Sequence, residues 1–235
     1  MSSEFRLSSA RLNLERPFPA LTSPTGYLFV ITYPYSGAGK IIEHINSHDG
    51  FDILGHICDS LLSLAETHAS LRPYGLAGAR SHTLRHEALG WAFADSFAAN
   101  ILRATPDSGV IGATLSYWGH DREKLLSGLL FLYSFFPNVR FVFITRNAQE
   151  LVGRRKSDAL NEAALTRRVQ HLDRTFALFQ KSFPELCYVQ SFNQFRVEKA
   201  QAKFDNFLGD FAPPQSVSPD PGPDHLAMLR KTDNA

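Results

Sequence analysis

Several features that would narrow the class of this 235-residue chain are scarce or missing. Only two cysteines occur, Cys58 and Cys187, far apart and outside any C-x-x-C motif, so neither a disulfide framework nor a zinc knuckle is indicated. The formal net charge of +1 lacks the basic excess of a general nucleic-acid binder. No apolar run reaches the roughly 18 residues that a membrane span requires, and the first residues have no apolar core of signal-peptide length. We therefore expect a soluble, cytoplasmic protein that neither binds nucleic acid nor spans a membrane.

What the chain does have is an alternation of short apolar runs with longer segments of helical spacing. The short runs are rich in β-branched and aromatic residues and predict strands buried on both faces, at 27–32, 109–114, 139–145 and 187–190. Helices are predicted between them, at 81–103, 122–136 and 161–183. This order predicts an α/β fold of three layers, P-loop-like, in which helices flank a parallel sheet.

The length and the apolar content of 44% fit a single domain. We place this domain at 25–211, between an N-terminal extension at 1–24 and a Pro-rich, flexible tail at 212–235. Within the domain, the helix at 161–183 repeats its apolar residues at steps of three and four, which predicts core packing for Leu165, Val169, Leu172, Phe176, Phe179 and Phe183.

The most informative stretch reads YLFVITYPYSGAGK at 27–40, where an apolar strand runs into a turn of small residues and then a helix. Backbone N–H groups at such a helix start point at one spot, which attracts phosphate or sulfate. The candidate anion-binding residues are therefore Tyr35, Ser36, Gly37, Ala38, Gly39 and Lys40. As a nucleoside-triphosphate loop, G-x-x-x-x-G-K-[ST], the motif is incomplete, because Pro34 replaces the first Gly and Ile41 replaces the magnesium-binding hydroxyl.

The same stretch resembles the 5′-phosphosulfate loop of sulfotransferases, which runs roughly T-Y-P-[KR]-S-G-T-T and matches TYPYSG at 32–37 in register. It departs from that pattern where Tyr35 replaces the usual Lys or Arg and where Ala38 and Gly39 replace two hydroxyl residues. The backbone amides are retained, and Lys40 is expected to supply the missing positive charge as a catalytic residue.

A second segment, DREKLLSGLLFLYSFFPNVRFVFITRNAQELVGRRKS at 121–157, resembles the helix, Phe-Pro-Asn turn, strand and helix start of glycan-type sulfotransferases. The resemblance implies that Arg146 binds the 3′-phosphate of the donor, 3′-phosphoadenosine 5′-phosphosulfate (PAPS). The family's partner hydroxyl falls on Arg154, whose guanidinium could bind phosphate through its fork of donors. Residues 146–181 hold eight Lys or Arg against four acids, which suits a small, highly anionic ligand.

The expected chemistry is sulfonyl transfer, in which one group must accept the proton of the attacking hydroxyl. His120, just past the strand at 109–114, is the candidate base, and Asp121, His56, His86 and Glu87 are its alternatives. The family's acidic residue at the end of that strand is missing here, since Leu115 occupies its place. This departure puts the chemical step in question more than the fold.

The predicted function is therefore that of a sulfotransferase, transferring a sulfonyl group from PAPS to a hydroxyl of a saccharide or similar small acceptor. Two alternatives stay open: a catalytically degenerate member of the same fold that binds nucleotide or a partner, and a P-loop kinase or NTPase. No metal is expected. The two H-x-x-x-H pairs, His44/His48 and His82/His86, lack the Glu of H-E-x-x-H and any obvious third ligand.

Overall fold

The computed structural model describes residues 24–57, 60–76, 86–105, 108–119, 121–154 and 162–211. Five strands form one sheet in the order β2-β3-β1-β4-β5, and every neighbouring pair is parallel. The strands are β1 (Gly26–Thr32), β2 (Phe51–His56), β3 (Val110–Ser116), β4 (Val139–Thr145) and β5 (Cys187–Ser191). The helices are α1 (Ala38–Asn46), α2 (Ser60–Leu76), α3 (His86–Asn100), α4 (Arg122–Phe135), α5 (Ala148–Arg154), α6 (Glu162–Ser182) and α7 (Glu198–Gly209), with a 3₁₀ turn at Gln194–Arg196.

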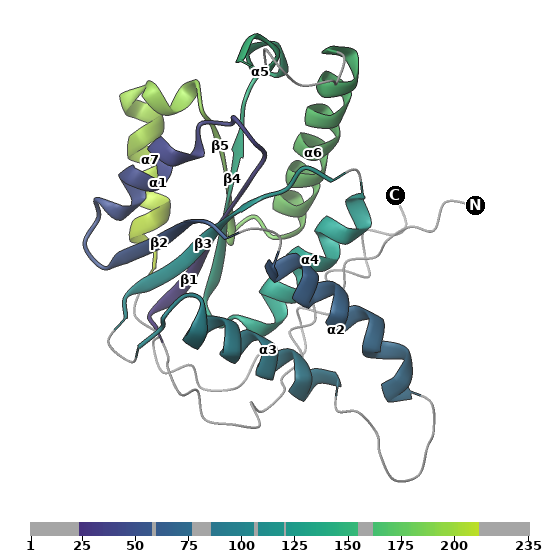
Figure 1. Ribbon diagram of the computed structural model, residues 1–235. Helices are drawn as coiled ribbons and strands as arrows, with labels where there is room; N and C mark the ends of the chain where they lie inside the picture. The colour runs from purple at the N-terminus through teal and green to yellow at the C-terminus, as the bar shows by residue number, and fades with distance from the viewer. Residues whose placement is uncertain are drawn as a thin grey trace, which may run out of the picture.

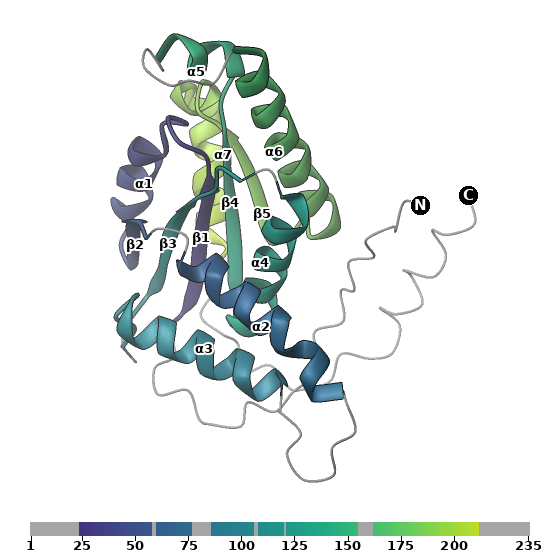
Figure 2. The same ribbon diagram turned by 45° about the vertical axis from the view of Figure 1, so that its right-hand side comes forward.

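Helices cover both faces of the sheet and make three layers (Figures 1 and 2). Helices α1 and α7 lie on one face, and α2, α3, α4 and α6 lie on the other. Alternate residues of the central strand β1 serve the two faces: Leu28 and Val30 pack toward α1 and α7, whereas Phe29 and Ile31 pack toward the larger helical layer. Every residue of β1 is buried, which explains its nearly continuous apolar sequence. The predicted α/β fold with a parallel sheet is confirmed.

Most predicted elements are present close to their predicted bounds. The apolar stripe of α6 is buried from Leu165 to Phe183, as its spacing predicted. Asp121 is the N-cap of α4, where its side chain accepts a hydrogen bond from the backbone N–H of Lys124 at 3.0 Å. The helix expected at 81–103 is observed as α3, and residues 77–85 lie outside the described part of the chain.

One strand, β2, was not predicted. Its sequence FDILGH has no apolar run, and only Ile53 within it is buried. As an edge strand it is covered less than β1, so polar residues such as Asp52 and His56 remain in contact with solvent. The partly exposed pattern of β2 follows from its position at the edge, and that position depends on the order of all the strands in the sheet.

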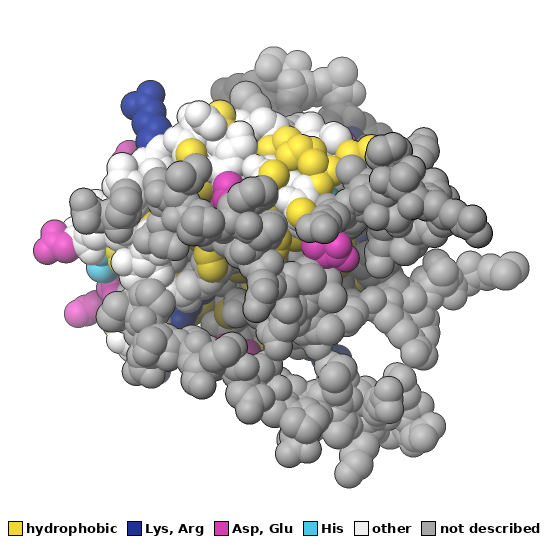
Figure 3. All heavy atoms as spheres, turned by 90° about the horizontal axis from the view of Figure 1, so that it is seen from below, with side chains coloured by type: hydrophobic (Ala, Val, Ile, Leu, Met, Phe, Trp, Pro, Cys, Tyr) yellow, Lys and Arg dark blue, Asp and Glu magenta, His cyan; other side chains and the backbone are white. Residues whose placement is uncertain are grey.

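The five strands point the same way, so their carboxyl ends meet at one edge of the sheet, below α5 in Figure 1. Ligands of open α/β sheets bind at that edge. The opposite end of the molecule is seen in Figure 3, where acidic side chains and a few basic ones are scattered around a small group of hydrophobic ones among the residues coloured by type. Within the described ranges, no helix is both long and apolar enough to cross a membrane.

Candidate functional site

The turn between β1 and α1 has the backbone shape of an anion cradle. Tyr35 and Gly37 both adopt left-handed conformations, with φ of 65° and 92°. At Gly37 no side chain would fit, because a Cβ atom there would lie 2.4 Å from the ring of Phe192. Both constraints require glycine at this position. The chain then enters α1 directly, with Gly37 as the N-cap residue.

The first amides of α1 are available to a ligand. Gly37 offers no side chain to cap α1. The N–H of Lys40 donates to the carbonyl of Gly37 at 3.3 Å, whereas the N–H groups of Ala38 and Gly39 have no acceptor among the described residues. None of the described residues lies within 4 Å of a Cβ placed on Gly39, so they leave the space beside these amides open. Ser36 instead faces inward, buried, with its hydroxyl 2.5 Å from that of Thr32. The candidate phosphate or sulfate site is therefore built mainly from backbone, with the positive end of the α1 dipole behind it.

Arg146 joins this loop from the end of β4. Its side chain is buried, and its Nη1 donates a hydrogen bond of 3.2 Å to the carbonyl of Tyr35. The guanidinium carbon also lies 4.6 Å from the centre of the Phe192 ring, the same ring that contacts Gly37. The structure thus brings together two sequence motifs more than 100 residues apart.

The guanidinium of Arg146 is already paired with a carboxylate. Its Nε donates to Oε2 of Glu150, one turn along α5, at 3.1 Å. The other oxygen of Glu150 accepts a hydrogen bond from Asn193 at 2.5 Å, so this carboxylate also ties α5 to the segment after β5. A phosphate approaching Arg146 would have to share it with Glu150 or displace Glu150. Sequence reasoning did not identify Glu150, although its i,i+4 spacing from Arg146 was a signal.

Tyr33 fastens the two loops to each other. Its phenolic oxygen accepts a hydrogen bond from the backbone N–H of Arg146 at 2.6 Å and lies 3.0 Å from the carbonyl of the same residue. Thr32 adds a contact of 3.3 Å from its hydroxyl to the carbonyl of Ile144. The ring of Tyr33 is buried and stacks on Phe176 of α6. These contacts fix the loop that follows β1 relative to the loop that follows β4.

Asp173 of α6 is a half-buried acid that contacts this arrangement. Its Oδ1 lies 3.3 Å from the hydroxyl of Tyr33. Burial raises the pKa of Asp173 to about 6, although the hydrogen bond from Tyr33 acts in the opposite direction. The same burial, with the nearby charge of Asp173 as a second cause, raises the pKa of the Tyr33 phenol. Asp173 follows Val169 by four residues and precedes Phe176 by three, so its place beside the apolar stripe was readable from the sequence.

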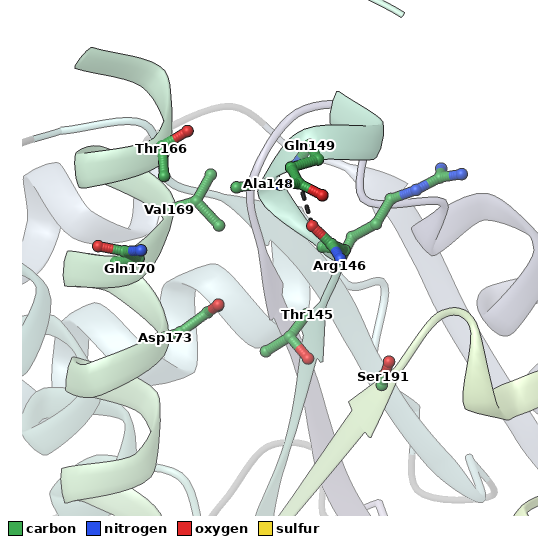
Figure 4. A pocket seen from close by; sticks show the side chains of 10 residues that line it. Thr145, Arg146, Ala148, Gln149, Thr166, Val169, Gln170, Asp173 and Ser191 are labelled. Atoms are coloured by element: carbon green, nitrogen blue, oxygen red, sulfur yellow. Dashed lines mark hydrogen bonds between the residues drawn. The ribbon is translucent and has the colours of Figure 1, made fainter. Parts of the chain in front are cut away.

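Asp173 lines an open pocket of about 440 Å³ between α6, the end of β4 and the start of α5. Figure 4 shows Asp173 and Val169 of α6 facing Thr145 across this pocket, while the side chain of Arg146 runs away from it toward the loop. Gln149, whose backbone N–H is held by Asn147 at 2.9 Å, closes the pocket near α5. The pocket adjoins the cradle, because it is lined by Arg146, which donates to the carbonyl of Tyr35, and by Asp173, which contacts the hydroxyl of Tyr33.

The remaining predicted residues lie as follows. Tyr35 and Lys40 are exposed at the cradle, so neither is used in the packing of the core. Arg154 ends α5, but its side chain lies outside the part of the structure that is described. His120 also lies outside the described residues. The structure therefore joins Tyr35, Gly37 and Arg146 in one site and leaves the roles of Arg154 and His120 as predictions.

Comparison with known proteins gives structural similarity only. No family model and no curated protein matches the sequence. The fold is similar to the sulfotransferase domain from the curacin biosynthetic pathway, with 13% identity and a TM-score of 0.45 over 80% of this chain and 75% of that one. A sulfotransferase from Alicyclobacillus acidocaldarius has 14% identity and a TM-score of 0.43 over 89% and 91% of the two chains. Thymidylate kinase from Candida albicans has 12% identity and a TM-score of 0.42 over 78% and 92%. Similarity at this level carries no argument about activity, which depends on the site itself.

Proposed function

We propose that the α/β domain at 25–211 binds PAPS and transfers its sulfonyl group to a hydroxyl of a saccharide or similar small acceptor. The observation that carries the proposal is the hydrogen bond from Arg146 to the carbonyl of Tyr35, 3.2 Å long. This hydrogen bond holds a buried guanidinium beside the backbone cradle. PAPS carries two separate anionic groups, the 5′-phosphosulfate and the 3′-phosphate, and so requires two such binding groups.

The residues present fit one anion directly. Amides at the start of α1, with Lys40 exposed beside them, would hold the 5′-phosphosulfate. The 3′-phosphate would bind Arg146, with Arg154 as the second predicted ligand, provided that Glu150 gives way. PAPS supplies the activated sulfonyl group. The chain would position the reactants and stabilise the charge on the sulfonyl oxygens.

The base that accepts the proton from the acceptor hydroxyl has candidates from the sequence and one from the structure. His120 is the one predicted from the sequence, with Asp121, His56, His86 and Glu87 as alternatives. Asp173 is the one that the structure adds, because its raised pKa of about 6 makes its carboxylate a better proton acceptor than an ordinary aspartate while still ionised at neutral pH. Its pocket beside Thr145 would then receive the acceptor.

A kinase or NTPase is less well supported. The position of the magnesium-binding hydroxyl is occupied by Ile41, which is fully buried against the sheet with Leu28 and Val30. An Ile there can neither bind Mg²⁺ nor be turned outward without exposing the core. A binding-only member of the fold is the stronger alternative, because Tyr35 replaces the loop cation and Glu150 already occupies Arg146.

Calorimetric titration with 3′,5′-ADP, 5′-AMP and ATP with Mg²⁺ tests the donor site. We expect 3′,5′-ADP to bind more tightly than 5′-AMP, and Glu150→Gln to increase this preference because it frees the guanidinium of Arg146. Equal affinity for the two nucleotides in both proteins would reject the assignment of Arg146. Tighter binding of ATP with Mg²⁺ would favour a kinase.

Transfer of radiolabel from PAPS to a panel of saccharides tests the reaction. We expect slow transfer by the parent and faster transfer by Tyr35→Lys, because that change restores a cation where charge develops during transfer. Asp173→Asn and His120→Gln separate the two candidate bases. Binding of 3′,5′-ADP without transfer by the parent or by Tyr35→Lys would identify the chain as a binding protein.

A further inference from the structure

Two histidines and an aspartate meet at the far end of α1 from the anion cradle. His44 lies in the last turn of α1, His48 follows the helix, and Asp205 belongs to α7. The Nε2 atom of His44 lies 2.7 Å from Oδ1 of Asp205, and that of His48 lies 3.4 Å from the same oxygen. The potential ligand atoms of all three side chains lie within 4.8 Å of one another.

The spacing of these atoms is close to that of a metal site. With bonds of about 2.0–2.2 Å to nitrogen and oxygen, ligand atoms of a tetrahedral zinc ion lie roughly 3.4 Å apart. The pair His48–Asp205 already has this separation, and His44 would need only a small side-chain rotation. Three protein ligands leave the fourth position to water, which can enter because the three side chains keep exposed fractions of 25%, 31% and 38%.

The hydrogen bonding of His48 favours metal binding. Its Nδ1 lies 3.0 Å from the carbonyl of His44, which can only accept, so Nδ1 carries the proton. In the neutral imidazole, Nε2 then presents its lone pair toward Asp205. A ligating histidine whose other nitrogen donates to a carbonyl is the usual arrangement at metal sites.

The surroundings also suit a cation. The carboxyl end of α1, with its partial negative charge, lies at His44. The ring of His44 packs edge-on against Phe195 and stacks on Phe204 at an interplanar angle of 29°, and the ring of His48 contacts Phe51. These aromatic contacts limit the movement of both imidazoles and so reduce the entropy lost on binding an ion.

We propose that His44, His48 and Asp205 bind a divalent transition-metal ion of the zinc class. The ion connects the end of α1 to α7, two helices that cover the same face of the sheet (Figure 2). Because the start of α1 forms the anion cradle, an ion at its other end holds in place the helix that carries the cradle. The site does not depend on the function proposed above.

The test is a titration of the metal-free, full-length chain with Co²⁺, whose visible absorption reports tetrahedral coordination, followed by displacement with Zn²⁺. We expect saturation at one ion per chain. Asp205→Asn and His48→Gln should each weaken Co²⁺ binding at least tenfold, because each removes a direct ligand, and even second-shell changes cost about 10–100-fold. Zn²⁺ should raise the melting temperature of the parent and not of these variants.

The other H-x-x-x-H pair provides the matched control. His82→Gln combined with His86→Gln removes the same number of imidazoles at the same spacing and should leave Co²⁺ affinity unchanged. Circular dichroism establishes that each variant is folded before titration, and His48→Gln, at a partly exposed position, serves if Asp205→Asn does not fold. The proposal is overturned if the parent shows no saturable absorption, or if binding is lost in the control pair and kept in the two ligand variants.

Discussion

The two ends of α1 have opposite chemistry although only the nine residues of that helix separate them. At its start, Gly37 and the first amides form the proposed anion cradle, and at its end His44, His48 and Asp205 form the proposed cation site. The helix dipole favours both arrangements, since its start is partially positive and its end partially negative. The ends differ in origin: the cradle comes from consecutive residues, whereas the cluster requires a side chain from α7.

The largest effect should follow a change at the anion end. Gly37→Val forces a β-branched residue into a conformation with φ of 92° and puts its Cβ against the ring of Phe192. We expect a loss of about 3 kcal/mol in the free energy of unfolding, the sum of backbone strain and overpacking, measured by urea denaturation. Gly39→Ala is the control: with open space around it, it should gain up to about 1 kcal/mol. Equal stability of the two variants would contradict this account of the cradle.

Arg146→Ala tests whether the anion site at the start of α1 includes Arg146, which follows β4. We expect it to weaken binding of 3′,5′-ADP roughly tenfold or more relative to 5′-AMP, because a hydrogen bond to a charged group contributes about 1.5–3 kcal/mol. Using the ratio of the two nucleotides cancels any loss of folded protein, which matters because Arg146 is buried. Arg167→Ala, an exposed change on α6, should leave the ratio unchanged. Equal weakening for both ligands would show that Arg146 does not contact the 3′-phosphate.

Asp173→Asn tests the electrostatics beside the cradle. The pKa of Asp173 is about 6 in the folded protein and near 3.8 when unperturbed, so the folded state holds the proton more tightly. Stability from this group is therefore fully present below pH 4 and is lost as the pH rises through 6. Asparagine removes that dependence. We expect the variant to gain about 1 kcal/mol relative to the parent between pH 4 and pH 8, less than the full shift implies because the carboxylate keeps some contact with water. A difference that does not vary with pH would show that Asp173 is well solvated.

The smallest effect should follow Asp205→Asn in the absence of metal. Its contacts with His44 and His48 involve partly exposed side chains, and such pairs contribute less than about 1 kcal/mol. Urea denaturation in the presence of a chelator measures this value. A much larger loss would mean that the cluster stabilises the fold without an ion, and the contrast between the two ends of α1 would then be one of stability rather than of binding.

The sequence predicted the fold well where a pattern is local. Strands β1, β3 and β4 are buried along nearly their whole length, so their apolar runs identify them, and α6 is identified by its stripe. Strand β5 lies at an edge and is only partly buried, against the prediction of burial on both faces, but its run CYVQ still marks it as a strand. Strand β2 has no such pattern because it lies at the edge, where burial depends on which strand pairs with β3. Local periodicity cannot report a neighbour that lies some 60 residues away in the chain.

The candidate sites divide in the same way. The sequence by itself predicted the turn that forms the candidate cradle, because the glycine and the helix start are consecutive and the left-handed φ of Gly37 is one that glycine favours. The left-handed φ of Tyr35 does not follow from its residue type. Only the tertiary structure decided that Glu150 pairs with Arg146, that Asp173 lies against Tyr33, and that Asp205 meets two histidines. The strength of a charge or a ligand depends on what surrounds it at distances of a few ångströms, and parallel crossovers bring those groups from distant parts of the chain.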